Sequence, residues 1–217
     1  MTPYTKTQIK ALIASRWGGR SDTDTIVDFE MQLAQTMTLE GTAGFLPSFL
    51  IKTVSSTLTS GTATLSLKAF NANRVLRIGE NGRVMWGASG ATAGTIELIR
   101  ATHAQLFAKY GTNTGTPAAF AIDGDTLTLF PTPNANCVIF ITAHFQDTAW
   151  TDVASGANNL WMEFAADWFI AEGMRRMAMH FTDEKAMMLY AAEADAARKR
   201  VMEWDDARRH PMDRREG

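Results

Sequence analysis

The chain has 217 residues, 46% hydrophobic and 20% charged, which fits one folded domain or one domain with an insertion and argues against bulk disorder. A net charge of −2 gives no overall attraction for nucleic acid or an anionic membrane. The single cysteine, Cys137, excludes an intramolecular disulfide and a zinc site built from several thiolates.

Two helices are predicted at the N-terminus. The first places apolar residues at helical spacing and stops at Gly18-Gly19; these residues are Ile9, Leu12, Ile13 and Trp17. The second opens in residues 21–24, whose side chains can cap free N–H groups, and ends at Gly41. Its expected buried face carries Ile26, Phe29, Leu33 and Met37. Together the two helices form a hairpin.

A β region begins at about Lys52, where the apolar period changes to two and Thr, Val, Ser and Gly replace helix formers. Residues 62–67 are predicted to form a strand. A hairpin is predicted to join residues 74–78 and 83–86 across the loop 79–82. A second joins residues 119–122 and 126–130 through Gly124, which can take the positive φ of a tight turn.

The strand Cys137–Phe145 follows a Pro-Thr-Pro stop and has bulky apolar residues on both faces, which indicates a central place in its sheet. Between the hairpins, Thr95–Tyr110 has apolar residues at helix-like spacing. We expect one short helix there, packed against the sheet.

Helical periodicity returns after a polar connector. Leu160–Phe181 is apolar nearly all round, which fits a helix surrounded by protein. Thr182 is predicted to cap a last helix that ends at His210-Pro211. Because the outer helices must meet to bury their apolar faces, we predict an α+β fold: a four-helix bundle formed by the N- and C-terminal helix pairs, with an inserted antiparallel β-domain carrying one short helix.

Four segments follow from this order. Residues 1–51 form the N-terminal hairpin, residues 52–150 the inserted β-domain, residues 151–204 the C-terminal helices and residues 205–217 a docking tail. The N-terminus lacks the apolar core of a signal peptide and no stretch approaches the roughly 18 apolar residues of a membrane span. We therefore expect a protein that is made and kept in a cytoplasm-like compartment and has no membrane contact.

No grouping of residues predicts catalysis, a cofactor or a metal site. The four histidines lie on separate elements, and Cys137 and His144, seven apart in one strand, would lie about 23 Å apart on opposite faces. Glu163 and Asp167 have the spacing of metal-carboxylate bundles but lack the accompanying histidine. The sequence therefore favours carboxylates that are solvated or pair with another subunit.

The C-terminal segment mixes basic and acidic residues, so its net positive charge is small. This pattern favours a helix end that becomes ordered on a protein partner over contact with nucleic acid. Truncation after Trp204 is expected to leave the subunit folded and to weaken its assembly. Twelve Met and six Trp also suit large contact surfaces.

The order of elements resembles the head-to-tail adaptor (head completion, tail-tubular-type connector) proteins of tailed bacteriophages. The resemblance is carried by short motifs along the chain: Gly-Phe-Leu-Pro-Ser-Phe-Leu at 44–50, the turn and strand ending Pro-Thr-Pro at 124–133, Val-Ile-Phe-Ile-Thr at 138–142, Asn-Asn-Leu-Trp at 158–161 and the Ala-rich segment 191–200. It implies a structural protein of the virion, a dodecameric ring at the head–tail junction that encloses the DNA exit channel. The implied partners are the portal protein, the tail nozzle or tail tube protein and, passively, DNA.

By this resemblance the helices would form the ring, the β-domain would face outward or toward the tail, and the segment from Asp205 would dock on the portal. The expected portal-docking residues are Trp204, Arg208, Arg209, Arg214 and Arg215. The expected inter-subunit residues are Trp161, Trp168, Arg175 and Arg176. Two alternatives stay open: a β-sandwich module that binds carbohydrate or a host surface through the loops 87–94 and 111–115, and a small hydrolase or nuclease.

Overall fold

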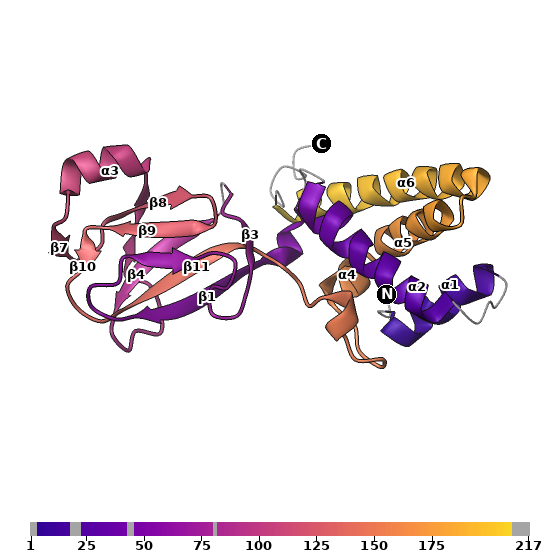
Figure 1. Cartoon of the computed structure of the whole chain (residues 1–217), viewed down its shortest axis with the longest axis horizontal. Coiled ribbons are helices and arrows are strands. Elements are labelled where there is room, and N and C mark those ends of the chain that lie inside the picture. The colour runs from indigo at the N-terminus through magenta and orange to yellow at the C-terminus, as the bar shows by residue number, and fades with distance from the viewer. Residues whose placement is uncertain (1–3, 18–22, 43–45, 80–81, 210–217) are drawn as a thin grey trace, which may run out of the picture. The chain divides into compact units, whose positions relative to one another are not determined.

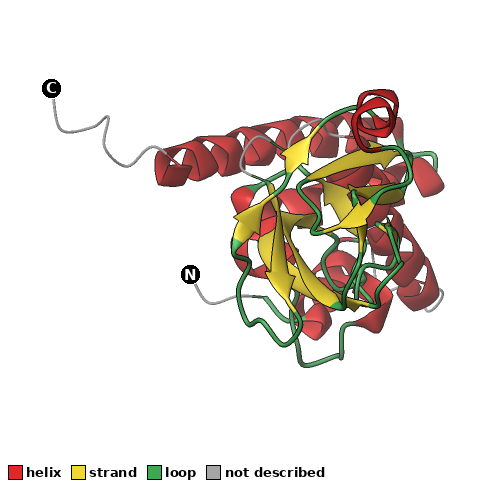
Figure 2. Ribbon diagram, turned by 90° about the vertical axis from the view of Figure 1, so that its left-hand side faces the viewer, coloured by secondary structure: helices red, strands yellow, loops and turns green. Residues whose placement is uncertain are grey.

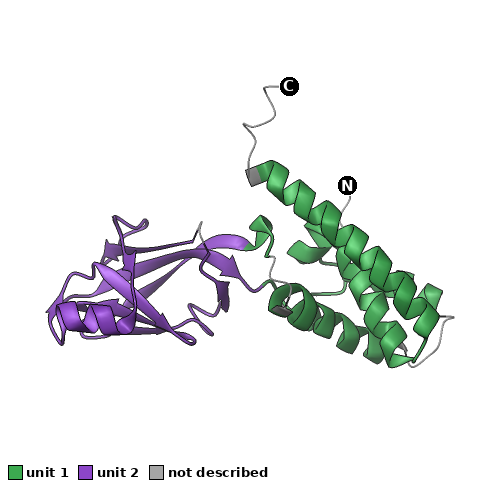
Figure 3. Cartoon of the chain, turned by 90° about the horizontal axis from the view of Figure 1, so that it is seen from above, with its two compact units in different colours: residues 1–50, 147–217 green, residues 51–146 purple. Residues whose placement is uncertain are grey.

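The computed structural model describes residues 4–17, 23–42, 46–79 and 82–209. The chain divides into two compact units, coloured separately in Figure 3. We call residues 1–50 together with 147–217 the helical unit and residues 51–146 the β unit.

The helical unit is organised around one helix, α5 (Ala166–His180), which packs against α1 (Lys6–Arg16), α2 (Thr23–Leu33) and α6 (Glu184–Arg209) (Figure 1). Its other helical segments are the π-helical η1 (Ala34–Thr42), the short η2 (Ser48–Leu50) and η3 (Trp150–Asp152), and α4 (Leu160–Phe164). The N- and C-terminal helices thus pack together, and the mixed α+β class is confirmed. The finer description as a four-helix bundle stays a prediction.

The buried face of α2 differs from the predicted one. Val27 and Met31 are buried, whereas Phe29 is 58% exposed and Met37 is also exposed. The helix is apolar on two sides, so its own periodicity does not select one. Asp28 helps fix the rotation, because its carboxylate accepts hydrogen bonds from Lys10 Nζ at 3.0 Å and Trp150 Nε1 at 2.8 Å.

Two boundaries near the C-terminus also differ from the expectation. The predicted helix 160–181 is interrupted at Ala165, which departs from helical geometry (φ −140°, ψ 34°) between α4 and α5. The expected start of the docking tail at Asp205 falls inside a helix, because α6 continues to Arg209, which agrees with the predicted helix end at His210-Pro211. The docking role of the segment stays a prediction. Asp205 is 1% exposed, and its Oδ1 accepts from the backbone N–H of Ser48 at 2.8 Å and from the Ser48 hydroxyl.

A buried polar network holds the segment by which the chain re-enters the helical unit. Gln35 Oε1 accepts from Trp150 N at 2.9 Å, and Gln35 Nε2 donates to Glu40 Oε1 at 3.0 Å and to the Thr148 carbonyl at 3.1 Å. Glu40 Oε1 also accepts from Trp161 Nε1 at 2.9 Å. The side chains of η1 thereby supply hydrogen-bond partners for backbone that has no regular partner of its own.

The start of α4 is fixed by caps from the same segment. Asp147 Oδ2 accepts from Leu160 N at 2.6 Å, and Asn159 Oδ1 accepts from Met162 N at 3.0 Å. These oxygens satisfy N–H groups that a helix N-terminus leaves free.

The β unit has two main sheets, drawn as yellow strands in Figure 2. The first sheet has the order β1–β11–β4–β5, and β3 also pairs with β11. The second sheet has the order β2–β9–β8–β6. Strands β7 and β10 form a small separate pair. The strands are β1 (Ile51–Leu58), β2 (Thr64–Ser66), β3 (Val75–Arg77), β4 (Arg83–Ala88), β5 (Ile96–Glu97), β6 (Ile99–Arg100), β7 (Thr114–Gly115), β8 (Ala119–Asp123), β9 (Thr126–Phe130), β10 (Thr132–Pro133) and β11 (Cys137–Phe145).

Residues from both main sheets, among them Leu127 and Ile139, form one apolar core. The hairpin of β8 and β9 is confirmed, and Gly124 takes φ 56° in its turn. The central place of β11 is also confirmed, since it pairs with β1, β3 and β4.

Three expectations for the β unit are wrong. The segments 74–78 and 83–86 do not pair with each other, because β3 and β4 pair with successive parts of β11. The predicted helix over 95–110 is shorter: α3 (His103–Tyr110) begins only after the capping box of Thr102 and Gln105, and the residues before it form β5 and β6. The sheets are not purely antiparallel either.

Two strand pairs, β6–β8 and β7–β10, are parallel. The chain between β6 and β8 passes through α3, which supplies the long crossover that a parallel pair needs. Leu106 of α3 packs with Ala119, Ala121 and Phe130, so the crossover helix covers one face of the β8–β9 hairpin.

Replacing Glu40 is expected to weaken the buried network in proportion to the acceptors it removes. Glu40→Ala should lower the free energy of unfolding by about 1–3 kcal/mol, because the buried Trp161 indole N–H loses its acceptor. Glu40→Gln keeps an acceptor oxygen and should cost less. Urea denaturation at neutral pH measures both, and equal stabilities of the two variants would contradict the role of this oxygen.

The same carboxyl predicts a pH dependence. Burial raises the pKa of Glu40, although hydrogen bonds from Gln35 and Trp161 oppose the shift. The native state then holds the proton more tightly than the unfolded chain, so this contribution is fully present below the ordinary carboxyl pKa and is lost as pH rises through the raised value. Wild-type protein should lose more stability than Glu40→Gln between about pH 4 and pH 7. Parallel curves for the two proteins would disprove this.

Asp205 should be required for the full stability of the helical unit. Asp205→Ala is expected to cost about 1–3 kcal/mol because the part-buried Ser48 N–H loses its acceptor, whereas Asp205→Asn keeps an acceptor oxygen and should cost less. A chain truncated after Trp204 should likewise unfold at lower denaturant than one truncated after Arg209. Equal midpoints for the two truncated chains would show that the contact is unimportant.

Candidate functional site

A groove of about 370 Å³ lies beside the C-terminal half of α6 in the helical unit. Its lining includes Tyr4, Phe164, Val201 and Trp204, and the start of α5 contributes Ala166. Tyr4, Phe164 and Trp204 all keep more than a third of their surface exposed. The groove therefore presents aromatic surface to solvent.

Two rings that line this groove, Phe164 and Trp204, belong to a longer series of stacked groups. Phe49 stacks on Phe164 with centroids 5.5 Å apart, and Phe164 stacks on Trp204 at 6.0 Å. The guanidinium of Arg208 lies over the Trp204 ring, 4.8 Å from its centroid. Trp204 and Arg208 are one helical turn apart, so α6 brings them together by its own geometry. We call Phe49, Phe164, Trp204 and Arg208 the aromatic ladder.

The rim of the groove is charged on both sides. Arg200 of α6 and Asp167 of α5 form an exposed ion pair with 3.6 Å between Nη2 and Oδ2, and Glu163 lies on the same rim. An apolar, aromatic centre with a polar rim is the anatomy of a protein–protein contact. This arrangement suits docking of a protein partner.

The structure places the predicted docking residues unequally. Trp204 and Arg208 come together in the aromatic ladder, as one surface. The side chain of Arg209, together with Arg214 and Arg215, lies outside the described residues. Sequence reasoning missed Tyr4, Phe49 and Phe164. Phe49 belongs to the motif at 44–50, but its contact with α4 depends on tertiary folding.

Two of the predicted inter-subunit residues are buried inside their own subunit. Trp161 is completely buried, and its ring lies edge-on to Phe49 at 5.1 Å and to Trp168 at 5.6 Å. Trp168 is 2% exposed. These large rings pack inside the helical unit and have almost no surface to offer a neighbour, so their burial gives no support to the inter-subunit role, which stays a prediction.

The two arginines predicted at a subunit interface have partners within the chain. Arg175 Nε donates to both carboxylate oxygens of the buried Glu172, at 3.1 and 3.0 Å, and this contact raises the pKa of Arg175. Arg176 donates to Thr38 Oγ1 at 3.3 Å and lies 3.9 Å from Glu30. Their contact with a neighbouring subunit stays a prediction.

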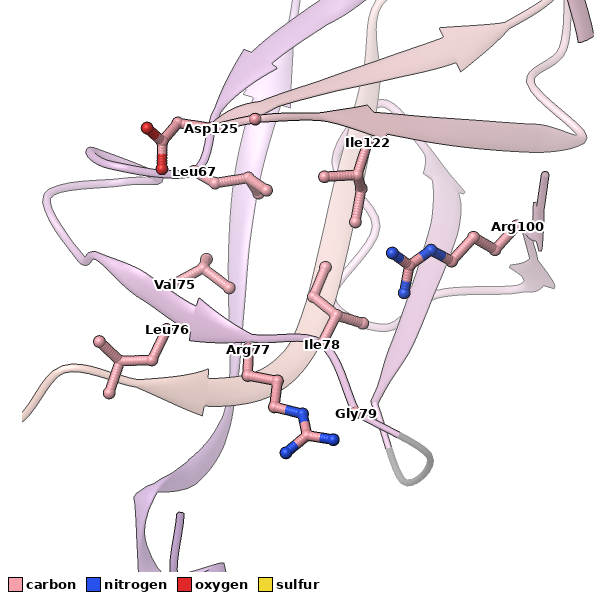
Figure 4. Close-up of a pocket in the computed structure, with 10 residues that line it drawn as sticks. Leu67, Val75, Leu76, Arg77, Ile78, Gly79, Arg100, Ile122 and Asp125 are labelled. Carbon is pink, nitrogen blue, oxygen red and sulfur yellow. The ribbon is translucent and has the colours of Figure 1, made fainter. Parts of the chain in front are cut away.

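The β unit has a separate cavity of about 560 Å³ (Figure 4). Ile78 and Ile122 face each other across it, and the side chains of Arg77 and Arg100 contribute positive charge. Asp125, at the other end, is paired with Lys68 at 2.9 Å. Among the described residues that line it there is none of the aromatic side chains that are common in ligand pockets, so it gives no support to a carbohydrate site.

Reactive and metal-binding side chains do not gather at one place in the described parts of the chain. No three His, Cys, Asp or Glu side chains among these residues gather closely enough to hold a metal ion. Cys137 is buried in β11, where burial raises the pKa of its thiol. None of the helices in the described ranges is both long and apolar enough to cross a membrane.

Comparison with known proteins identifies the chain's family. The model of the family described as SU10 adaptor protein matches residues 5–215, nearly the whole chain. None of the curated proteins compared with the chain matches it. The match extends over both units and confirms the resemblance to phage head-to-tail adaptors, a family of structural proteins and not of enzymes. The chain belongs to the SU10 adaptor protein family.

Proposed function

We propose that this protein is a virion structural protein that joins the portal to the tail as one subunit of a ring around the DNA exit channel. The ring is dodecameric, as the resemblance implies, and is assembled in the host cytoplasm before it occupies the head–tail junction. The observation that carries the proposal is the family match over residues 5–215.

The helical unit is the part that we propose forms the ring and meets the portal. Its α1, α2, α5 and α6 would act as a four-helix bundle, and the aromatic ladder with its groove would contact the portal protein. The groove supports this role because it combines exposed rings with a mixed-charge rim. The residues after Arg209 would extend the same contact.

The β unit is proposed to meet the tail nozzle or tail tube protein, and DNA would pass through the channel without being held. The small net charge of −2 supports passive contact, since a strongly basic ring would retain DNA. The competing function, a carbohydrate-binding β-sandwich, has no comparable supporting observation.

Trp204→Ala and Arg208→Ala should weaken binding to the cognate portal, because the first removes an exposed ring and the second the cation stacked on it. A loss of at least about thirtyfold in affinity is expected for Trp204→Ala, as for an interface hot spot. Truncation after Arg209, which removes Arg214 and Arg215, should also weaken binding. Sedimentation velocity with purified portal measures each effect.

Ile99→Ala is the matched control, because Ile99 is an exposed apolar residue of the β unit and lies outside the groove. It should leave portal binding unchanged, and circular dichroism should show every variant folded. Undiminished portal binding by folded Trp204→Ala and by the truncated chain would contradict the docking site. A wild-type protein that stays monomeric both alone and with its portal, by light scattering and electron microscopy, would contradict the ring itself.

A further inference from the structure

The outer side of α2 carries an apolar stripe that the described part of the subunit leaves partly exposed. Phe29 is 58% exposed, and Ile26 and Leu33, three residues before and four after it, are half-buried on the same side. Their spacing puts them on one helical stripe. We call Ile26, Phe29 and Leu33 the α2 face. A helix stripe of this kind costs free energy in water and is typical of a contact surface.

A second apolar surface lies on the first half of α6. Met188 is 73% exposed and Leu189 is 56% exposed. One and two turns further on, Ala192 and Ala196 are exposed as well. We call Met188, Leu189, Ala192 and Ala196 the α6 face. Its two large side chains are followed by small ones, so another helix can approach the backbone of α6 closely.

The two faces belong to different flanks of the helical unit. Helix α5 packs against both α2 and α6 and lies between them in Figure 1, whereas no extensive contact joins α2 to α6 in the described parts of the chain. Met31, on the inner side of α2, lies so close to Gly173 of α5 that a Cβ on Gly173 would come 2.0 Å from the Met31 Sδ. The inner side of α2 is therefore occupied by α5, and the α2 face points elsewhere.

We propose that the α2 face of one copy packs against the α6 face of the next copy. The partner is a second copy, because every chain carries one α2 face and one α6 face. Self-association therefore covers both faces at once, and in a closed ring neither face remains exposed. Phenylalanine and methionine are also the residue types enriched at such contacts. This inference rests on the proposed ring and names the surfaces that build it.

A contact between two different surfaces has a geometric consequence. It is heterologous, so each added copy again exposes one face of each kind, and the series ends only when it closes into a ring. A contact of the α2 face with another α2 face, or of the α6 face with another α6 face, would instead stop at a dimer. The two kinds of contact can be told apart by blocking one face at a time.

The test uses two variants of the full chain. Phe29→Glu blocks the α2 face, and the double change Met188→Glu and Leu189→Glu blocks the α6 face. Each variant alone should associate at least about thirtyfold more weakly than wild type, the effect of losing an interface hot spot. Mixed together, they should form a 1:1 heterodimer and nothing larger, because each supplies the one intact face that the other lacks. Native mass spectrometry measures the species.

Met179→Glu is the matched control, since Met179 is an equally exposed apolar residue near the end of α5 that belongs to neither face. It should assemble as wild type does, and circular dichroism should show all variants folded. The inference is overturned if either blocked variant assembles normally, if the mixture stays monomeric, or if one blocked variant forms a homodimer through its intact face.

These results separate the inference from the proposed function. Wild-type protein that forms no ring alone or on its portal contradicts both. If wild type assembles only on the portal, the variants are added to the portal and the bound copies are counted. Blocked variants that fill the portal as wild type does would overturn the α2–α6 contact and leave the proposed ring intact.

Discussion

The helical unit depends on a buried hydrogen bond in η1, which the Gln35 amide donates to the Glu40 carboxylate. The chain leaves this unit at Leu50, builds the whole β unit and returns at Asp147. The returning segment has little regular structure, so its backbone groups need partners from elsewhere. Gln35 binds Trp150 N and the Thr148 carbonyl, while Glu40 accepts from Asp147 N and Gln32 accepts from Thr151 N. These side chains together fix where the C-terminal part of the chain enters the unit.

The same network also sets the position of the candidate docking site. Glu40 holds the indole of Trp161, Trp161 lies edge-on to Phe49, and Phe49 stacks on Phe164, which in turn stacks on Trp204. The series thus runs from a buried hydrogen bond at Glu40 to the exposed ring of Trp204, which α6 also holds in place through its packing on α5. A rigidly held ring loses less conformational entropy on binding than a free one, which favours affinity for a protein partner.

The outer surfaces of the helical unit divide their tasks by chemistry. The groove beside α6 has rings with a charged rim, which suits recognition of a different protein, whereas the α2 and α6 faces are apolar and suit packing of like subunits. One chain can therefore carry self-association and portal docking on separate residues. The burial of Trp161 and Trp168 fits this division, since their size stabilises the subunit that presents these surfaces.

The sequence alone determined the local elements, because these depend on residues close together in the chain. The turn at Gly124, the two-faced apolar strand β11 and the helical character of both ends follow from spacing and backbone preference. Of the docking site, Trp204 and Arg208 could be predicted from α6 itself. Only the tertiary structure decided which side of α2 is buried, why β3 and β4 both pair with β11, and that Phe49 meets Phe164. Each depends on a partner distant in sequence, and local periodicity cannot choose between two apolar sides of one helix.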